Sequence, residues 1–202
     1  MRLVLASGSP RRAELLRAAG FVFETVVTDV DEAIRAGESA TAYVCRLAAE
    51  KSAAALAALR ACATTAVAQA GSPAEVVIIG ADTAVVVDGA IFGKPRDADD
   101  AAQMLRQLSG RRHEVITGVS LRQGPHEVGR VEITTVHFAV LSDDDVGWYV
   151  ASGEGRDKAG AYAIQGLGSR FIPRIEGSYS NVVGLPVACV VELLVSLLAS
   201  RT

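Results

Sequence analysis

Residues 75–92, EVVIIGADTAVVVDGAIF, carry the features that decide the fold class. Glu75–Ile79 is an apolar run rich in β-branched residues, which predicts a buried strand. The pair Asp88-Gly89 separates the apolar runs Ala84–Val87 and Ala90–Phe92, and such a pair is a strong signal for a β-hairpin turn. The segment therefore brings antiparallel pairing into a sheet.

Helical and extended segments alternate over the rest of the chain. Helices are expected at Pro10–Ala19, Thr41–Cys62 with Thr41 as a possible cap, Ala98–Leu108, from the cap Ser142 to about Ala151, and Val187–Ser200. Further strands are expected at Arg2–Ala6, His113–Arg122 and Val131–Leu141, and Phe21–Thr28 looks extended. Gly153–Gly184 is expected to be mostly irregular, and Ala63–Glu75 to be a surface loop or an extended helix end. Hairpins mixed with crossover helices predict an α/β protein with a mixed sheet. No stretch has the composition of a linker, so residues 1–202 are expected to form one domain.

Composition excludes several classes of protein. A net charge of -3 argues against a general nucleic-acid binder, although a local basic cluster could hold a small anion. The apolar stretch Val182–Ala199 is split by Pro186 and interrupted by Glu192, which predicts a core helix and no membrane span. The N-terminus lacks the pattern of a signal peptide. The three cysteines and three histidines are scattered, which suits buried thiols in a reducing cytosol and argues against a zinc site.

The stretch Ser7–Arg12, SGSPRR, places two arginines at the start of a helix. With Ser9 as the N-cap, Arg11 and Arg12 fall in the first turn, where the helix dipole disfavours a cation by ~0.3–1 kcal/mol. A phosphate chain bound there would make both arginines useful partners, with the hydroxyls of Ser7 and Ser9 as further donors. The alternative is that both arginines point into water.

Asp82 is a candidate functional carboxylate. It follows the apolar run Glu75–Ile79, at what is expected to be the end of a buried strand, and ligand sites of α/β sheets gather at carboxyl ends of strands. A carboxylate there could be a general base or a metal ligand, or it could cap its own turn.

Three further charged residues are candidates. Lys51 falls on the apolar stripe of its helix, so its ammonium either extends to the surface or enters a site. Lys94, between Gly93 and Pro95, is a cation presented by a loop. Glu32 in an acidic loop is a solvated charge or a magnesium ligand, since Mg²⁺ takes few protein carboxylates.

The glycine-rich run Arg156–Gly166 combines charged residues, including Lys158, with an aromatic ring and the amide of Gln165, which suits a base or sugar pocket. Several cations and few carboxylates, without a His or Cys nucleophile, favour phosphoryl chemistry by water and a divalent ion. The motif G-x-x-x-x-G-K-[ST] is absent, which excludes a P-loop nucleotide hydrolase.

Taken together, these segments resemble the Maf family of nucleotide pyrophosphatases. The matching pieces, in family order, are LASGSPRRAELL (Leu5–Leu16), VDE (Val30–Glu32), YVCRLAAEK (Tyr43–Lys51), GADTAVV (Gly80–Val86), GKP (Gly93–Pro95), SGRRHEVITGV (Ser109–Val119), DKAGAYAIQG (Asp157–Gly166) and GSYSNVVGLP (Gly177–Pro186). The resemblance implies a long mixed sheet with flanking helices and two lobes around a cleft, as in inosine-triphosphate pyrophosphatases. It also implies hydrolysis of a nucleoside triphosphate to the monophosphate and pyrophosphate, a divalent metal (Mg²⁺ or Mn²⁺), a cytoplasmic location and a homodimer.

The resemblance also assigns roles to residues. Asp82 matches the family's proton acceptor, and Arg12, Thr83 and Gln165 match positions tied to substrate choice. The run DKAGAYAIQG looks like the dTTP/UTP branch, because the 7-methyl-GTP branch usually has glutamate where Gln165 stands and cysteine where Lys158 stands. An amide both donates and accepts hydrogen bonds, so it can read a pyrimidine edge.

The expected reaction joins these residues in one site. The metal would bridge Asp82, Glu32 and the phosphates, while Arg12, Lys51 and Lys94 neutralise charge on the phosphate chain. The sequence departs from the family pattern in a longer Ala63–Glu75 and in lacking a proline just before Asp157. Two alternatives are a hydrolase that removes modified nucleotides and a non-enzymatic nucleotide-binding protein that arrests cell division.

Overall fold

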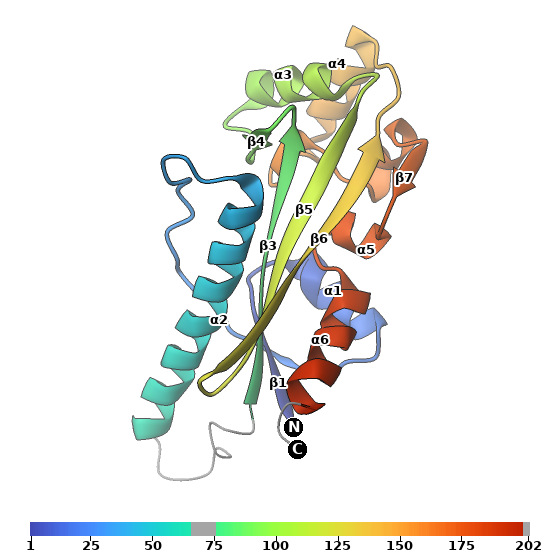
Figure 1. Cartoon of the computed structure of the whole chain (residues 1–202). Coiled ribbons are helices and arrows are strands. Elements are labelled where there is room, and N and C mark those ends of the chain that lie inside the picture. The colour runs from blue at the N-terminus through green and yellow to red at the C-terminus, as the bar shows by residue number, and fades with distance from the viewer. Residues whose placement is uncertain (66–75, 200–202) are drawn as a thin grey trace. The chain divides into compact units, whose positions relative to one another are not determined.

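The computed structural model describes residues 1–65 and 76–199, and of these it describes the side chains of 1–61 and 76–199. Within them, seven strands form one sheet in the order β2-β1-β3-β5-β6-β7, with β4 beside β3 (Figure 1). The strands are β1 (Arg2–Ala6), β2 (Glu24–Thr25), β3 (Val76–Val87), β4 (Ala90–Phe92), β5 (Arg112–Gln123), β6 (His126–His137) and β7 (Arg174–Glu176). The α-helices are α1 (Pro10–Ala18), α2 (Ala40–Thr65), α3 (Ala98–Leu108), α4 (Asp143–Ser152), α5 (Tyr179–Val183) and α6 (Val187–Ala199).

The sheet is mixed, as predicted. Strand β1 pairs in parallel with β2 and β3, whereas β4 pairs antiparallel with β3 and β7 antiparallel with β6. The turn between β3 and β4 has positive φ at both Asp88 (49°) and Gly89 (81°), the conformation that a two-residue hairpin loop requires. The α/β class and the hairpin are therefore confirmed.

The chain divides into two compact units. The first contains Met1–Asp82, Thr117–Glu132 and Gly184–Thr202, and the second contains Thr83–Ile116 and Ile133–Val183. Strands β3, β5 and β6 run from one unit into the other. The expectation of a single domain over 1–202 stays a prediction.

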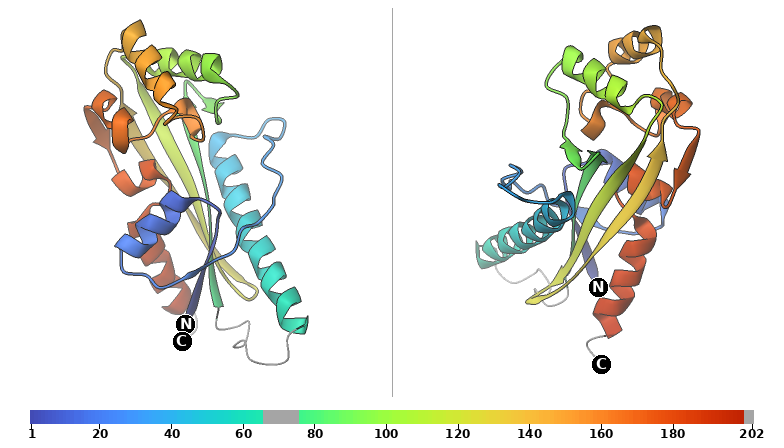
Figure 2. Two further views of the ribbon diagram at one scale, coloured as in Figure 1. Left: turned by 180° about the vertical axis from the view of Figure 1, so that it is seen from behind. Right: turned by 45° about the horizontal axis from the view of Figure 1, so that its top comes forward.

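In the first unit, helices cover both faces of the sheet, with α2 on one side and α1 and α6 on the other (Figures 1 and 2). Successive side chains of a strand point to opposite faces, so β1 contributes to two cores. Leu3 and Leu5 pack into the cluster that contains Leu16 of α1 and Leu193 of α6. The intervening Val4 packs into the cluster that contains Ala55 of α2 and Ile78 of β3.

Helix α2 lies unusually close to the sheet at a glycine of β3. A Cβ atom on Gly80 would lie 2.1 Å from the carbonyl oxygen of Ala48 and 2.8 Å from the amide nitrogen of Ser52. A glycine inside a strand commonly marks such an approach of another backbone. Gly80 therefore sets how near α2 can come to β3.

The second unit has its own core. Helices α3 and α4 contact one another, and the core includes Phe138, Tyr149, Tyr162 and Phe171. The ring of His113, which is 3% exposed, is edge-on to Tyr162, and its Nε2 lies 2.7 Å from the Tyr162 hydroxyl. Gly153–Gly184, expected to be irregular, also contains two short 3₁₀ helices, Ala159–Ala161 and Gly166–Phe171.

Several element boundaries differ from the prediction. Strand β3 is continuous through Gly80 and Asp82, because Gly80 marks a close approach of α2 and does not end the strand. Helix α2 begins at Ala40, and its cap is Ser39, whose hydroxyl accepts from the Ala42 amide, so Thr41 is not the cap.

Two other boundaries also shift. Strand β6 begins at His126, before the expected Val131, because Gly129 lies within the strand and does not interrupt it. Only Glu24–Thr25 of the expected extended stretch pairs as a strand. Helix α2 extends to Thr65 and therefore includes the first residues of the segment Ala63–Glu75, which was expected to be a surface loop or an extended helix end. Residues 66–75 of that segment lie outside the described residues.

The described residues test two predictions, that the cysteines are buried and that no helix spans a membrane. Cys189 is buried but Cys45 is exposed, because the rotation of about 100° per residue that buries Val44 turns its neighbour toward solvent. The prediction of buried thiols is therefore wrong for Cys45, and the side chain of Cys62 lies outside the described set. None of the helices in 1–65 and 76–199 combines the length and apolar character needed to cross a bilayer.

Replacing Gly80 with alanine tests the close approach of α2. Because the added methyl group meets backbone atoms that cannot yield without moving the helix, we expect Gly80→Ala to lower the free energy of unfolding by about 1–3 kcal/mol. Gly147 in α4 has no atom near the position of an added Cβ, so Gly147→Ala should stabilise by about 0.5–1 kcal/mol. Urea titration of both variants provides the measurement, and a neutral Gly80→Ala would contradict this account of the packing.

His113 predicts a pH dependence of stability. Burial lowers the pKa of its imidazole from 6.5 to about 4. The unfolded chain therefore binds the proton first as the pH falls, and stability present above pH 6.5 is lost between 6.5 and about 4. The loss at this one residue is on the order of 3 kcal/mol. Denaturant titrations at several pH values should show a shallower decline in His113→Gln than in the unsubstituted chain, and equal slopes would contradict the prediction.

Candidate functional site

Asp82 lies where β3 extends past the end of its neighbour. The last paired residue of β1 is Ala6, opposite Gly80, so Asp82 is two residues beyond the carboxyl end of β1. Alternation along β3 places Asp82 on the same face as Ile78 and Gly80, which is the face covered by α2. The sequence thus predicted the right kind of position, a carboxyl end of a strand, but assigned it to the wrong strand.

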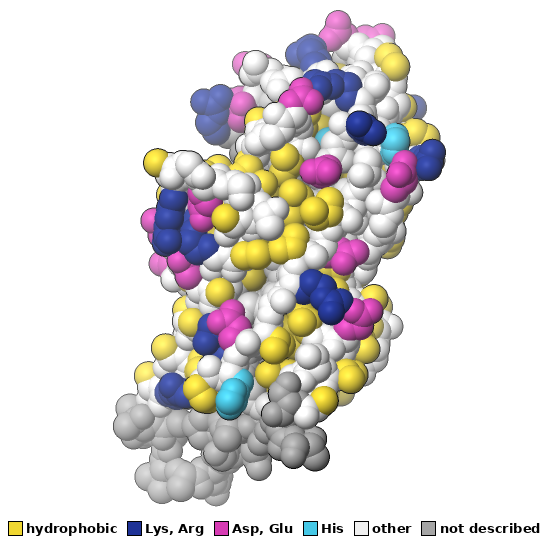
Figure 3. Space-filling view, viewed as in Figure 1, with side chains coloured by type: hydrophobic (Ala, Val, Ile, Leu, Met, Phe, Trp, Pro, Cys, Tyr) yellow, Lys and Arg dark blue, Asp and Glu magenta, His cyan; other side chains and the backbone are white. Residues whose placement is uncertain are grey.

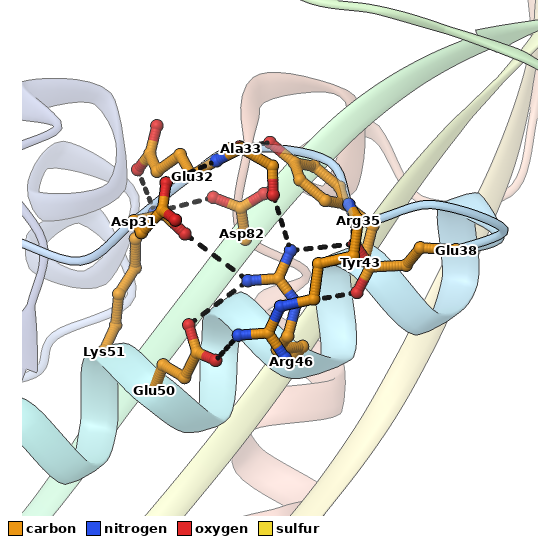
Figure 4. Close-up of polar contacts among 10 residues, drawn as sticks. All are labelled: Asp31, Glu32, Ala33, Arg35, Glu38, Tyr43, Arg46, Glu50, Lys51 and Asp82. Carbon is orange, nitrogen blue, oxygen red and sulfur yellow. Dashed lines mark hydrogen bonds and ion pairs between the residues drawn. The ribbon is translucent and has the colours of Figure 1, made fainter.

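Lys51 of α2 meets this carboxylate. Its Nζ donates to Asp82 Oδ1 at 2.6 Å and lies 2.7 Å from Glu32 Oε1 (Figure 4). Lys51 is only 7% exposed, so the ammonium enters the site and does not extend to the surface. One buried cation is therefore shared by two carboxylates from separate parts of the chain.

Arg12 joins the same cluster from α1. Its Nε donates to the carbonyl oxygen of Gly184 at 2.7 Å, and its Nη1 donates to Ser7 Oγ at 3.2 Å. The negative charges of Asp82 and Glu32 oppose the lowering of its guanidinium pKa by burial and so favour its charged form. The alternative that both arginines point into water is therefore wrong for Arg12, while Arg11 is half-buried and its charge acts on Arg12.

Ser7 and Ser9 have different surroundings. Ser7 is buried, and its hydroxyl accepts from the Ser9 amide at 3.2 Å as well as from Arg12. Ser9 occupies the N-cap position of α1, but its side chain makes no capping hydrogen bond. The backbone at the start of this helix is thus ordered by the Ser7 hydroxyl.

Burial and neighbouring charges act on Asp82 in opposite directions. Burial raises the pKa of its carboxyl, and the charge of Glu32 adds to the rise, whereas Lys51 and Arg12 lower it; the net shift is upward. Burial also lowers the pKa of the Arg12 guanidinium, an effect that Asp82 and Glu32 oppose. A carboxylate with a raised pKa is a stronger base, which suits proton transfer from water.

Asp82 and Glu32 have the donor chemistry that a divalent ion would need. Both carboxylates contact the same ammonium nitrogen, so they face a common point, and their hard oxygen atoms are the ligands that Mg²⁺ and Mn²⁺ prefer. Within the described residues no group of three or more His, Cys, Asp or Glu side chains could hold a metal. An ion held here would take its other ligands from water and substrate.

Sequence reasoning gave no role to Tyr43 and Arg46, although both stand in the quoted motif YVCRLAAEK. The Tyr43 hydroxyl donates to the carbonyl oxygen of Glu32 at 3.1 Å, and Arg46 contacts the same loop (Figure 4). The spacing of Arg46 and Glu50 was a further signal, because it predicts an ion pair on one helix face.

The remaining candidates belong to the second unit. Lys94 is exposed in the loop after β4, and the neighbouring Gly93 carbonyl accepts from the Gly160 amide, which ties this loop to the glycine-rich run. The Lys158 ammonium contacts Asp157 Oδ1 at 2.6 Å. Gln165 is exposed and immediately precedes the 3₁₀ helix Gly166–Phe171.

Glu154 holds the chain that follows Gln165. Its carboxylate accepts from the Leu167 amide at 2.8 Å, the Gly168 amide at 2.9 Å and the Tyr149 hydroxyl at 2.9 Å. Thr83, the last of the candidates, is half-buried next to Asp82 on β3. The roles expected for Thr83, Lys94, Lys158 and Gln165 stay predictions.

Basic and acidic side chains are interspersed over the face shown in Figure 3. Among the described residues that face carries no broad basic area, and Arg12 is linked to the carboxylates that hold Lys51 through their charges. Such a local arrangement suits a small anion.

Known proteins of similar sequence identify the family of this chain. The family described as "Maf-like protein" matches residues 2–197. A dTTP/UTP pyrophosphatase of Chromobacterium violaceum is 50% identical over 186 residues, covering 92% of this chain and 89% of the relative. One of Escherichia coli O157:H7 is 47% identical over 199 residues (98% and 94%), and one of an Anaeromyxobacter strain is 48% identical over 198 residues (96% and 88%). The chain therefore belongs to the Maf family.

Proposed function

We propose that this chain is a nucleoside triphosphate pyrophosphatase that hydrolyses dTTP and UTP to the nucleoside monophosphate and pyrophosphate. The observation that carries the proposal is the pairing of buried Lys51 with both Asp82 and Glu32. The charges of the same two carboxylates act on Arg12. Its relatives named dTTP/UTP pyrophosphatase align over nearly the whole chain and supply the substrate class.

In the proposed reaction, Asp82 orients the attacking water and accepts its proton. The raised pKa of this carboxyl favours that role, because the carboxylate then holds the proton more strongly. Water attacks the α-phosphorus, and pyrophosphate leaves as one unit. Arg12 and Lys51 bind the phosphate oxygens and stabilise the charge that develops on them, a role that Lys94 also takes in this proposal.

Asp82 and Glu32 would hold the divalent ion. When bound, Mg²⁺ or Mn²⁺ neutralises phosphate charge and lowers the pKa of coordinated water. The proposed contacts to the phosphate chain also include Ser7, Ser9 and Arg11. The nucleoside is proposed to contact Thr83, Lys158 and Gln165. A homodimer in the cytoplasm and a role in removing modified nucleotides are further parts of this proposal.

Asp82→Asn tests the proposed base. The amide cannot accept the proton from water, so pyrophosphate release from dTTP should fall by about 10²–10⁴-fold while the fold remains intact. Asp88→Asn makes the same chemical change at an exposed turn residue, where asparagine tolerates positive φ, and should leave the rate unchanged. A coupled pyrophosphate assay and circular dichroism give the two readouts. An Asp82→Asn variant of nearly full activity removes Asp82 from this role.

Gln165→Glu tests the proposed choice of base. A carboxylate cannot donate a hydrogen bond, so kcat/KM for dTTP and UTP should fall by roughly 10–100-fold, with a smaller change for purine triphosphates. Leu167→Ala, an exposed position in the following 3₁₀ helix, serves as the control. The measurement is a panel of nucleoside triphosphates, including modified pyrimidines, scored by pyrophosphate release. Nucleotide binding without turnover by the unsubstituted chain would favour the non-enzymatic alternative.

A further inference from the structure

The loop that carries Glu32 is held to α2 through its backbone. Three successive carbonyl oxygens accept hydrogen bonds from two α2 side chains: Asp31 from Arg46 Nη1 at 3.4 Å, Glu32 from the Tyr43 hydroxyl at 3.1 Å, and Ala33 from Arg46 Nη2 at 3.0 Å. Figure 4 shows these contacts converging on the loop from one side of the helix. The backbone on both sides of Glu32 is therefore fixed by α2.

Arg46 holds the far end of the same loop by an ion pair. Its Nε donates to Glu38 Oε1 at 2.6 Å, and its Nη2 donates to Glu38 Oε2 at 2.8 Å. These side chains are only 12% and 9% exposed, and the hydrogen bonds from Arg46 lower the pKa of Glu38 to about 2. Glu38 also accepts from the Arg35 amide at 3.0 Å, which closes the loop on itself.

The geometry suits arginine and not lysine. The Arg46 guanidinium donates hydrogen bonds to five oxygen atoms. These are both carboxylate oxygens of Glu38, the carbonyls of Asp31 and Ala33, and Glu50 Oε2 at 3.3 Å. A planar fork with five N–H donors can satisfy such a set, whereas an ammonium has three donors around one point.

We propose that Arg46 is a positioning residue of the active site. It fixes residues 31–38 so that the Glu32 carboxylate stays on Lys51 beside Asp82, while its own hydrogen bonds go to Glu38, Glu50 and the loop backbone. Lys51 and Arg46 lie on the same helix, so α2 sets the distance between the ammonium and the loop that must reach it. The inference rests on the proposed function for its kinetic consequence, but its structural consequence is independent of any substrate.

The first test measures the loop without substrate. In Arg46→Lys, the amides of Ala33, Arg35 and Glu38, which are hydrogen-bonded within the loop, should exchange with deuterium at least about tenfold faster than in the unsubstituted chain. Arg35→Lys is the matched control, because it makes the same change at a loop arginine whose side chain is 63% exposed and contacts Glu50 but none of the loop carbonyls named above. In this control the amides of Ala33 and Glu38 are compared. Unchanged exchange in Arg46→Lys, or an equal increase in Arg35→Lys, overturns the proposal.

The second test asks whether Arg46 acts through Glu32. Arg46→Lys should lower kcat for dTTP by about 10–100-fold, since a displacement of about 1 Å costs that much. In the Glu32→Gln background the same substitution should cost less than about threefold, because the carboxylate that it positions is already absent. Single-turnover measurements at high enzyme concentration give the residual rates, and thermal unfolding checks the fold of each variant.

The outcomes separate the two proposals. An equal loss in both backgrounds assigns Arg46 a general structural role and overturns the inference. If the unsubstituted chain releases no pyrophosphate from any triphosphate, the proposed function fails, while the exchange experiment still decides whether Arg46 fixes the loop.

Discussion

The arrangement of the site depends on one buried ammonium group shared by two carboxylates. A buried lysine is costly unless its charge is paired, and Lys51 meets this condition through both Asp82 and Glu32. The contact in turn depends on packing, because Lys51 reaches β3 only where α2 approaches the strand at Gly80. A glycine without catalytic atoms therefore decides whether the charged groups meet. It does so by allowing the helix backbone, and not merely a flexible side chain, to come close.

The ends of β1 and α1 explain why an anion site should form beside this cluster. Strand β1 stops at Ala6 while β3 continues, which leaves Asp82 without a β1 partner, and the charge of Arg12 acts on its carboxyl. Arg12 lies in the first turn of α1, where a cation is unfavourable by itself. The carbonyl of Gly184 and the charges of Asp82 and Glu32 offset this cost in the structure, and a phosphate chain would do so in the proposed complex.

The sequence predicted well what local patterns determine and less well what depends on packing between distant segments. The bounds of α3 and the Asp88-Gly89 hairpin follow from capping and turn chemistry, and both are confirmed. The continuity of β3 was missed because a glycine in a strand looks the same in sequence whether it ends the strand or admits a helix. The contacts of Arg46 could not be predicted because they go to backbone carbonyls, which every residue possesses and no motif records.

That dependence on backbone groups has a further consequence for the site. Because Tyr43 and Arg46 hold carbonyl oxygens, the contacts themselves place no demand on the side chains of Asp31 and Ala33. The side chain between them is different, since Glu32 must present a carboxylate to Lys51. A single helix thus supplies both the buried cation and the groups that hold the loop opposite it. The relative position of Lys51 and Glu32 is consequently set by α2, although the Glu32 side chain itself is 54% exposed.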